Sequence, residues 1–172
     1  MKAIFLDRDG VINQEVGYLH KSKDFKFIDG VFESCRYFQS LEYKLIVITN
    51  QSGIARGYYQ EEDFHALTKW MLVQFDNQDI DISDVFFCPH SPKLNCKCRK
   101  PQPGMLLEAR DKYGINMEDS WIIGDKEVDI NAAIAAGVNN TILVKSGHSV
   151  DEMNTEAKFL LESIKESVQV II

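Results

Sequence analysis

The stretch KLIVITN, residues Lys44–Asn50, is an uninterrupted apolar run that is rich in β-branched residues and ends in two polar ones. Such a run is typical of a strand in the middle of a parallel sheet, where both faces are covered. Other short apolar runs are expected to form the neighbouring strands: Ala3–Asp7, Asp84–Cys88, Ser120–Asp125 and Thr141–Lys145. Together they predict a sheet built largely from buried parallel strands.

Segments with helical spacing of their apolar residues separate these strands. The predicted helices are Val31–Leu41, Gln60–Phe75, Pro103–Gly114 and Glu127–Gly137. The tail is expected to add an edge strand at Ala157–Leu161 and then a helix. Because strands alternate with helices, the chain predicts an α/β fold with a Rossmann-like parallel sheet and helices on both faces.

Length and composition restrict the class of protein. The 172 residues contain no linker-like segment, which indicates a single domain over residues 1–172. The net charge of −7 makes a nucleic-acid partner unfavourable. No apolar run approaches the roughly 20 residues that span a bilayer, and the start MKAIFLDRDG lacks a signal-peptide core. We therefore expect a cytoplasmic protein that binds neither nucleic acid nor membrane, with reduced thiols.

Carboxylates follow two of the predicted strands. Asp7 ends the first strand, Asp9 lies two residues later, and Asp125 ends a later one. The carboxyl ends of parallel strands form the usual ligand site of such sheets, so these three acids are expected to converge. Like charges about 4 Å apart repel by roughly 4 kcal/mol even in a fairly polar medium, so the cluster needs a cation, and oxygen ligands suit Mg²⁺. The alternative for DRDG is an ordinary surface turn.

The segment CPHSPKLNCKCRKP, Cys88–Pro101, carries a second possible metal site. Its potential ligands occur in two pairs spaced i and i+2: Cys88, His90, Cys96 and Cys98. Three cysteines and one histidine form a standard tetrahedral zinc donor set, whereas free cysteines in an irregular loop are the alternative. A disulfide does not fit the expected compartment. We call residues 88–98 the Cys-His loop and expect a zinc-binding loop that places Arg99 and Lys100 beside a small anionic ligand.

Four segments in this order, FLDRDGVIN, VITNQSG, CRKP and IIGDKEVDI, resemble the haloacid dehalogenase (HAD) superfamily of phosphotransferases. GYLHKSKDFKFIDGV, NQSGIARGYY and the Cys-His loop are similar to its group of heptose bisphosphate and histidinol phosphatases. The resemblance implies a HAD-like fold. Neither interval between these segments has room for a large cap domain, so we expect an open site roofed by loops.

The resemblance also implies a role for each motif residue. Asp7 would be the nucleophile that forms an aspartyl phosphate, and Asp9 would be the general acid and base. Thr49 would hydrogen-bond the phosphoryl oxygens, and Lys100 would neutralise their charge. Asp125 would hold Mg²⁺ together with Asp7 and the backbone carbonyl of Asp9.

Further residues are expected to contact the substrate. Arg99 would bind phosphate with its planar fork, as part of the catalytic set. Arg8 is predicted to have no role in the site, and an exposed loop is the alternative for Glu15 and Tyr18. The expected substrate contacts are Glu15, Val16, Gly17, Tyr18, Asn50, Gln51, Ser52, Arg99, Lys100 and Lys126.

The resemblance favours a monomeric, Mg²⁺-dependent phosphatase of a small sugar phosphate, which removes the C7 phosphate of D-glycero-D-manno-heptose 1,7-bisphosphate. Such a step belongs to the synthesis of lipopolysaccharide or other surface sugars. The short spacing between His90 and Cys96 leaves histidinol phosphate open as the substrate. A non-catalytic interaction module stapled by zinc is the alternative from another class.

Overall fold

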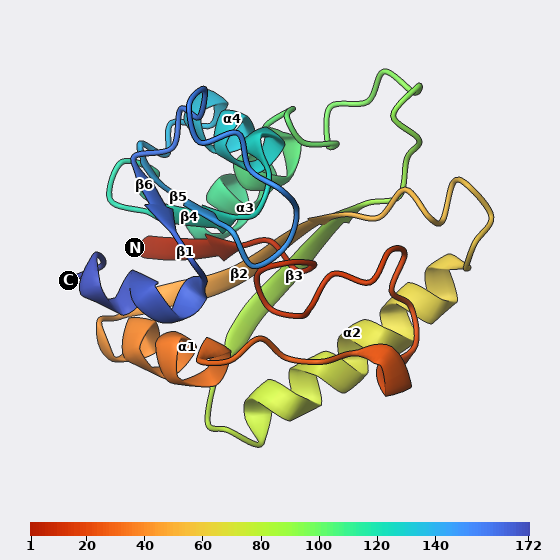
Figure 1. Cartoon of the computed structure of the whole chain (residues 1–172), viewed down its shortest axis with the longest axis horizontal. Coiled ribbons are helices and arrows are strands. Elements are labelled where there is room, and N and C mark those ends of the chain that lie inside the picture. Colours follow the sequence, from red (N-terminus) through yellow and green to blue (C-terminus); the bar gives the residue numbers. More distant parts are fainter.

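Six parallel strands form one sheet in the order β3-β2-β1-β4-β5-β6. The computed structural model describes residues 1–172 (Figure 1). From β1, the chain adds β2 and β3 on one side of the sheet and then β4, β5 and β6 on the other. The strand order therefore reverses beside β1. The strands are β1 (Lys2–Leu6), β2 (Tyr43–Asn50), β3 (Ile82–Cys88), β4 (Trp121–Gly124), β5 (Asn140–Val144) and β6 (Phe159–Leu161).

Helices cover both faces of this sheet, as the sequence predicts (Figure 1). The α-helices are α1 (Val31–Ser40), α2 (Glu61–Asp76), α3 (Gly104–Tyr113) and α4 (Glu127–Ala135). One hydrophobic cluster contains the buried faces of α1 and α2, and a second contains those of α3 and α4. Two 3-10 helices complete the structure, η1 (Ser22–Asp24) and η2 (Ile164–Gln169).

The central strand explains why both faces need a cover. Ile4 and Leu6 of β1 point into the first cluster, whereas Ala3 and Phe5 point into the second. Alternate residues of a strand face opposite sides of the sheet, so an apolar run without alternation must be buried on both. All four side chains are fully buried.

Most predicted elements are confirmed, with ends that differ by one or two residues. The expected helix stop at Gly114 is a left-handed residue with φ of 64°. The edge strand in the tail also forms. The helix expected after it is wrong in type, because Ile164–Gln169 is a 3-10 helix. Six residues give too few α-helical hydrogen bonds to offset the cost of nucleation.

Only loops lie over the carboxyl ends of the strands. One 3-10 helix and α1 separate β1 from β2, and α2 separates β2 from β3. Neither connection holds a cap domain, which agrees with the sequence prediction. None of the helices has the length and apolar character needed to cross a bilayer.

Candidate active site

A cavity of about 450 Å³ opens at the carboxyl ends of β1, β2 and β4. It collects nearly all the predicted site residues, but Thr49 lies buried behind it, and Val16 is exposed outside it. The predicted residues that line it are Asp7, Asp9, Glu15, Gly17, Tyr18, Asn50, Gln51, Ser52, Arg99, Lys100, Asp125 and Lys126. Gly53, Arg56 and Tyr59 also line it, from the loop 53–59 that the sequence predicts to roof the site. Val128, Asp129 and His148 line it without any prediction from the sequence.

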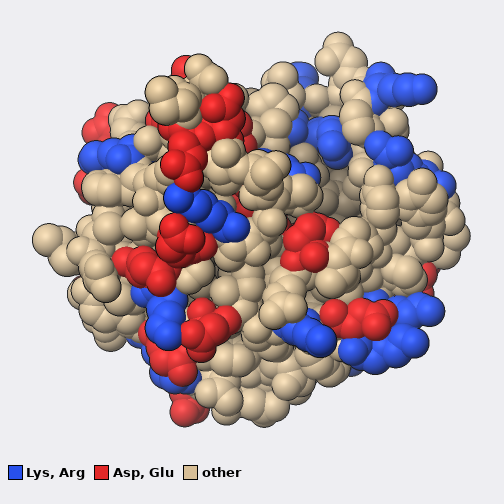
Figure 2. Space-filling model, viewed as in Figure 1, with Lys and Arg blue, Asp and Glu red and all other residues tan.

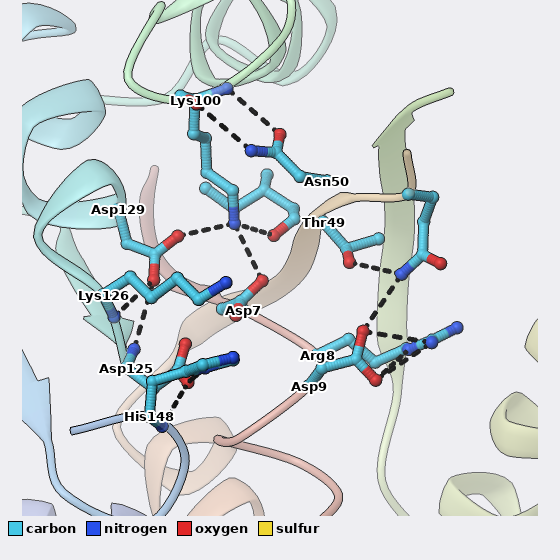
Figure 3. Close-up of polar contacts among 12 residues, drawn as sticks. Asp7, Arg8, Asp9, Thr49, Asn50, Lys100, Asp125, Lys126, Asp129 and His148 are labelled. Atoms are coloured by element: carbon cyan, nitrogen blue, oxygen red, sulfur yellow. Dashed lines mark hydrogen bonds and ion pairs between the residues drawn. The ribbon is translucent and has the colours of Figure 1, made fainter. Parts of the chain in front are cut away.

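Three buried carboxylates meet at the floor of the cavity. They belong to Asp7, Asp125 and Asp129, and an oxygen of each lies within 4.8 Å of the others. Asp7 follows β1, Asp125 follows β4, and Asp129 comes from the first turn of α4. The expected convergence of Asp7 and Asp125 is therefore confirmed. The third acid is Asp129, whereas the Asp9 carboxylate lies apart from the group (Figure 3).

Lys100 is the cation that the protein itself supplies to this cluster. Its Nζ lies 2.8 Å from Asp7 Oδ1 and 2.7 Å from Asp129 Oδ1, and it also donates to the Ile48 carbonyl (Figure 3). Burial disfavours the ammonium, but the charges of Asp129 and Asp7 outweigh burial and raise the pKa of Lys100. Lys100 therefore remains charged at neutral pH.

One ammonium does not balance three carboxylates. Burial, with the charges of Asp129 and Asp125, raises the pKa of Asp7, although Lys100 offsets part of the effect. Burial and the charge of Asp129 raise the pKa of Asp125 to about 6. Asp125 Oδ1 is buried and has no hydrogen-bond partner. An unpaired oxygen among other carboxylates suits a hard divalent cation such as Mg²⁺, so the donors present fit this ion.

Close packing fixes the orientation of Asp125. A Cβ atom on Gly147 would lie 2.1 Å from Asp125 Oδ2, and one on Gly10 would lie 2.4 Å from it. The same oxygen accepts a hydrogen bond from the His148 amide at 3.0 Å and contacts His148 Nδ1 at 2.6 Å. Two glycines and one loop residue thus enclose one carboxylate oxygen and leave the other directed at the cluster.

Asp129 holds the start of α4 as well as Lys100. Its Oδ2 accepts hydrogen bonds from the backbone amides of Asp125 at 3.1 Å and Lys126 at 3.0 Å. Carboxylates in the first turn of a helix commonly satisfy its free amides in this way. Sequence reasoning missed this residue, although GDKEVD offered a signal, because an acid four positions after Asp125 starts a predicted helix.

The Cys-His loop brings four potential metal ligands together. Cys88 Sγ lies 3.0 Å from Cys98 Sγ and 3.7 Å from Cys96 Sγ, and His90 Nδ1 lies 3.4 Å and 3.2 Å from the sulfurs of Cys88 and Cys98. Tetrahedral zinc with bonds of about 2.3 Å to sulfur and 2.0–2.1 Å to nitrogen separates its ligands by roughly 3.5–3.8 Å. All these cysteines are free. The donor types fit zinc, and three of the four separations would need to widen by about 0.1–0.8 Å to hold the ion.

One thiol of this cluster is prepared for metal binding. Burial opposes ionisation of Cys96, but hydrogen bonds from the Arg99 amide and neighbouring side chains outweigh it and lower the pKa to about 6. Burial and the neighbouring thiol of Cys98 raise the pKa of Cys88 to about 12. Only the charge of a bound metal would make all three thiols thiolates at neutral pH.

The end of the Cys-His loop is fastened to β2. The Asn50 side chain donates from Nδ2 to the Lys100 carbonyl and accepts from the Lys100 amide, both at 3.1 Å. The neighbouring Gln51 donates to Thr49 Oγ1 at 2.8 Å, which leaves the threonine hydroxyl hydrogen free to donate. Asn50 thus positions Lys100, a role that the sequence did not indicate.

Positive charge gathers on one side of the cavity, although the whole chain is acidic. Figure 2 shows Lys and Arg side chains gathered at the upper right, over the end where the Cys-His loop and the β2–α2 connection lie in Figure 1. Asp and Glu gather on the left of this face. Arg56, Arg99 and Lys126 line the cavity itself. Such a rim favours entry of an anionic ligand.

Comparisons with known proteins identify relatives along nearly the whole chain. A model of HAD-hydrolase-like proteins matches residues 97–167. D-glycero-beta-D-manno-heptose-1,7-bisphosphate 7-phosphatase of Escherichia coli K12 is 44% identical, over 98% of this chain and 93% of its own length. The alpha-anomer enzyme of Campylobacter jejuni is 47% identical, over 94% and 92%.

A solved structure supports the same relationship. D,D-heptose 1,7-bisphosphate phosphatase from B. bronchiseptica, complexed with magnesium and phosphate, superimposes with a TM-score of 0.90. It is 28% identical, over 99% of this chain and 98% of its own.

Proposed function

Because the chain belongs to the heptose 1,7-bisphosphate 7-phosphatase family of HAD-like hydrolases, we propose that it removes the C7 phosphate of D-glycero-D-manno-heptose 1,7-bisphosphate. The observation that carries this proposal is 44–47% identity to these phosphatases over nearly the full length. The convergence of Asp7, Asp125 and Lys100 in one cavity supports it.

Asp7 is the nucleophile in the first step. A carboxylate oxygen of Asp7 attacks phosphorus, the bond from phosphorus to the sugar oxygen breaks, and an aspartyl phosphate forms. Lys100, 2.8 Å from Asp7, and the Thr49 hydroxyl stabilise the negative charge of the transferring group. Arg99, which also lines the cavity, binds the phosphoryl oxygens.

Asp9 moves the protons of both steps. Protonated Asp9 gives its proton to the departing sugar oxygen, and the resulting carboxylate then takes a proton from the attacking water. Water attacks phosphorus, releases inorganic phosphate and restores the Asp7 carboxylate. Asp9 lines the cavity but lies outside the acid cluster. This position leaves its carboxylate to exchange protons with the ligand, whereas the cluster would hold the metal.

Two metals complete the proposed enzyme. Asp7, Asp125 and the Asp9 carbonyl would hold Mg²⁺, while Asp129 holds Lys100 beside them. Bound Mg²⁺ supplies neutralising charge for the cluster and for the phosphoryl oxygens. The Cys-His loop would hold a structural zinc, since four protein ligands leave no open position for water. The related B. bronchiseptica structure contains magnesium and phosphate, which supports the first site.

The second phosphate of the substrate needs its own cation. Lys126 and Arg99 reach the cavity from different elements, and Glu15, Gly17 and Tyr18 offer groups for sugar hydroxyls. We further propose that residues 1–172 act as one domain, as a monomer, in the cytoplasm. Relatives of both anomeric specificities have similar identity, so the anomer is a question for experiment.

A substrate panel tests the proposal. Phosphate release is measured with the alpha and beta heptose 1,7-bisphosphates and with histidinol phosphate, with and without Mg²⁺. We expect one heptose bisphosphate to give the highest kcat/KM, and activity to require Mg²⁺. Higher kcat/KM for histidinol phosphate would reject the heptose assignment, and no Mg²⁺-dependent release from any phosphomonoester would reject the enzyme.

A matched pair of variants tests the nucleophile. Asp7→Asn removes the attacking oxygen's charge and is expected to abolish turnover. Asp111→Asn makes the same chemical change at an exposed position on α3 that pairs only with Arg110, and it should retain activity. Full activity of Asp7→Asn would contradict the mechanism.

A further inference from the structure

Arg8 is a buried arginine beside the proposed general acid. Its side chain is 1% exposed, and it is not among the residues that line the cavity. The sequence analysis assigned it no role in the site. In the structure, its guanidinium is directed at Asp9 (Figure 3).

Both oxygens of the Asp9 carboxylate accept hydrogen bonds from neighbouring side chains, although the residue still lines the cavity. Arg8 donates to Oδ1 from Nε at 3.3 Å and from Nη2 at 3.0 Å, and Nη2 also donates to Oδ2 at 3.1 Å. Asn13 Nδ2 donates to Oδ1 at 3.0 Å, and Gln51 Nε2 donates to Oδ2 at 3.1 Å. A planar fork that meets both oxygens fixes the rotation of the carboxylate as well as its position.

Arg8 is itself anchored on its other side. Nη2 donates to the Leu19 carbonyl at 3.0 Å, directly after the proposed sugar-contacting segment, and the guanidinium lies 5.9 Å from the ring centre of Phe64 on α2. Burial of a charged group without ligand contact costs free energy, and the remaining nitrogen, Nη1, has no partner. A side chain kept at such a cost, and aimed at one catalytic carboxylate, indicates a role in the site.

We propose that Arg8 is a positioning residue for Asp9, which holds the acid–base carboxylate at the angle from which it protonates the departing sugar oxygen. This inference rests on the proposed function. In the first step the proton moves from Asp9 to the leaving oxygen as the bond to phosphorus breaks, so the angle of Asp9 matters only when the leaving group needs a proton. Displacement of a catalytic group by about 1 Å can cost about 10²-fold in rate.

Two substrates with different leaving groups test this role. p-Nitrophenol leaves as a stabilised anion without a proton, whereas a sugar alcohol leaves only when it is protonated. The measured quantity is kcat/KM, which reports the steps up to departure of the leaving group. General acid catalysis contributes about 10²–10⁴-fold, so Arg8→Met should lower kcat/KM for heptose bisphosphate at least about tenfold. For p-nitrophenyl phosphate the change should stay below about threefold.

Arg8→Met could also unfold part of the protein, so the result is expressed as the ratio of the two kcat/KM values in one preparation. This ratio does not depend on the folded fraction. Arg8→Lys keeps the charge but loses the planar fork. Its ratio should therefore lie between those of Arg8→Met and the wild type. Phe38→Leu, a buried change on α1 without contact to Asp9, should lower stability and leave the ratio unchanged.

Asp9→Asn shows how far the ratio of the two kcat/KM values changes when the acid is lost altogether. An equal loss on both substrates in Arg8→Met, or no loss on either, would overturn the positioning role. A wild-type protein that hydrolyses neither substrate would instead reject the proposed function. An Asp9→Asn variant that does not discriminate would reject Asp9 as the acid.

Discussion

At the scale of single residues, the site depends on how closely backbone and carboxylates approach. Gly147 leaves room for Asp125. Its backbone is not in the left-handed conformation, so backbone geometry alone does not require a glycine at this position. An alanine there would cause no backbone strain of its own, but its Cβ would lie 2.1 Å from Asp125 Oδ2 and 2.8 Å from the Gly10 Cα. The glycine is explained by the carboxylate beside it.

Gly147→Ala should therefore weaken Mg²⁺ binding with little change in secondary structure. We expect the Mg²⁺ Kd to rise at least about tenfold, since changes to the groups that orient a metal ligand typically cost about 10–100-fold in metal affinity. Isothermal titration calorimetry measures the Kd. Gly114→Ala is the control, because Gly114 has φ of +64° and no neighbours within 4 Å, and it ends α3 outside the cavity. Equal Kd values in wild type and Gly147→Ala would contradict this account.

The titration of Asp125 gives a pH dependence. Burial and the charge of Asp129 raise the pKa of Asp125 to about 6 in the metal-free protein, and Mg²⁺ binds the ionised form. Protonation of Asp125 should therefore make Mg²⁺ affinity fall as the pH decreases through about 6. The same shift means that the metal-free protein loses stability as the pH rises from about 4 to about 6.

Calorimetric titrations with Mg²⁺ between pH 5 and pH 8 would check this prediction. An affinity at pH 5 as high as at pH 7 would show that Asp125 is not a ligand, or that its carboxylate stays ionised throughout this range.

At the scale of elements, the Cys-His loop has no regular secondary structure and depends on its metal cluster. It follows β3 and leads into Lys100, which Asn50 of β2 fastens by two hydrogen bonds. Loss of the metal should therefore disorder the loop and displace Arg99 and Lys100, while the sheet stays intact.

Cys96→Ser should reduce bound zinc and lower activity at least about tenfold, because removal of one charge-stabilising group typically costs 10²–10³-fold in kcat. Metal analysis and kcat measure the two effects, and far-ultraviolet circular dichroism should change little. Cys35→Ala is the control, since Cys35 is buried in the other hydrophobic cluster and away from the loop. Full activity in zinc-free protein would contradict a role for the loop in placing Lys100.

At the scale of the whole molecule, the acid cluster couples folding to Mg²⁺. Asp7 is distant in sequence from Asp125 and Asp129, and only the folded sheet brings the three within 4.8 Å. The unfolded chain has no such site, so Mg²⁺ binds the folded state and stabilises it by mass action.

Mg²⁺ at a hundred times its Kd should stabilise the protein by about 2.7 kcal/mol. For a chain of this size, a change of that order raises Tm by roughly 5–10 °C. Differential scanning calorimetry with and without Mg²⁺ measures the shift. Asp125→Asn should abolish most of it, whereas Asp84→Asn, on β3 outside the cavity, should leave it unchanged. A Tm independent of Mg²⁺ in the wild type would argue against the cluster as a metal site.

The sequence by itself determined the parallel sheet, its helices on both faces and most residues of the cavity. Unbroken apolar strands such as Lys44–Asn50 require cover on both faces, and a parallel sheet brings the polar residues at their ends to one edge. The spacing of the cysteines and the histidine in the Cys-His loop likewise indicated a metal site from sequence alone.

Only the tertiary structure decided which side chains meet and which stay apart. It placed Asp129 beside Asp7, turned Asp9 toward Arg8, and left Val16 outside the cavity. The physical reason is that local sequence fixes which element a residue belongs to and where that element ends. The direction of a side chain depends on partners that are distant in sequence: Lys100 for Asp129, and Gln51 for Asp9.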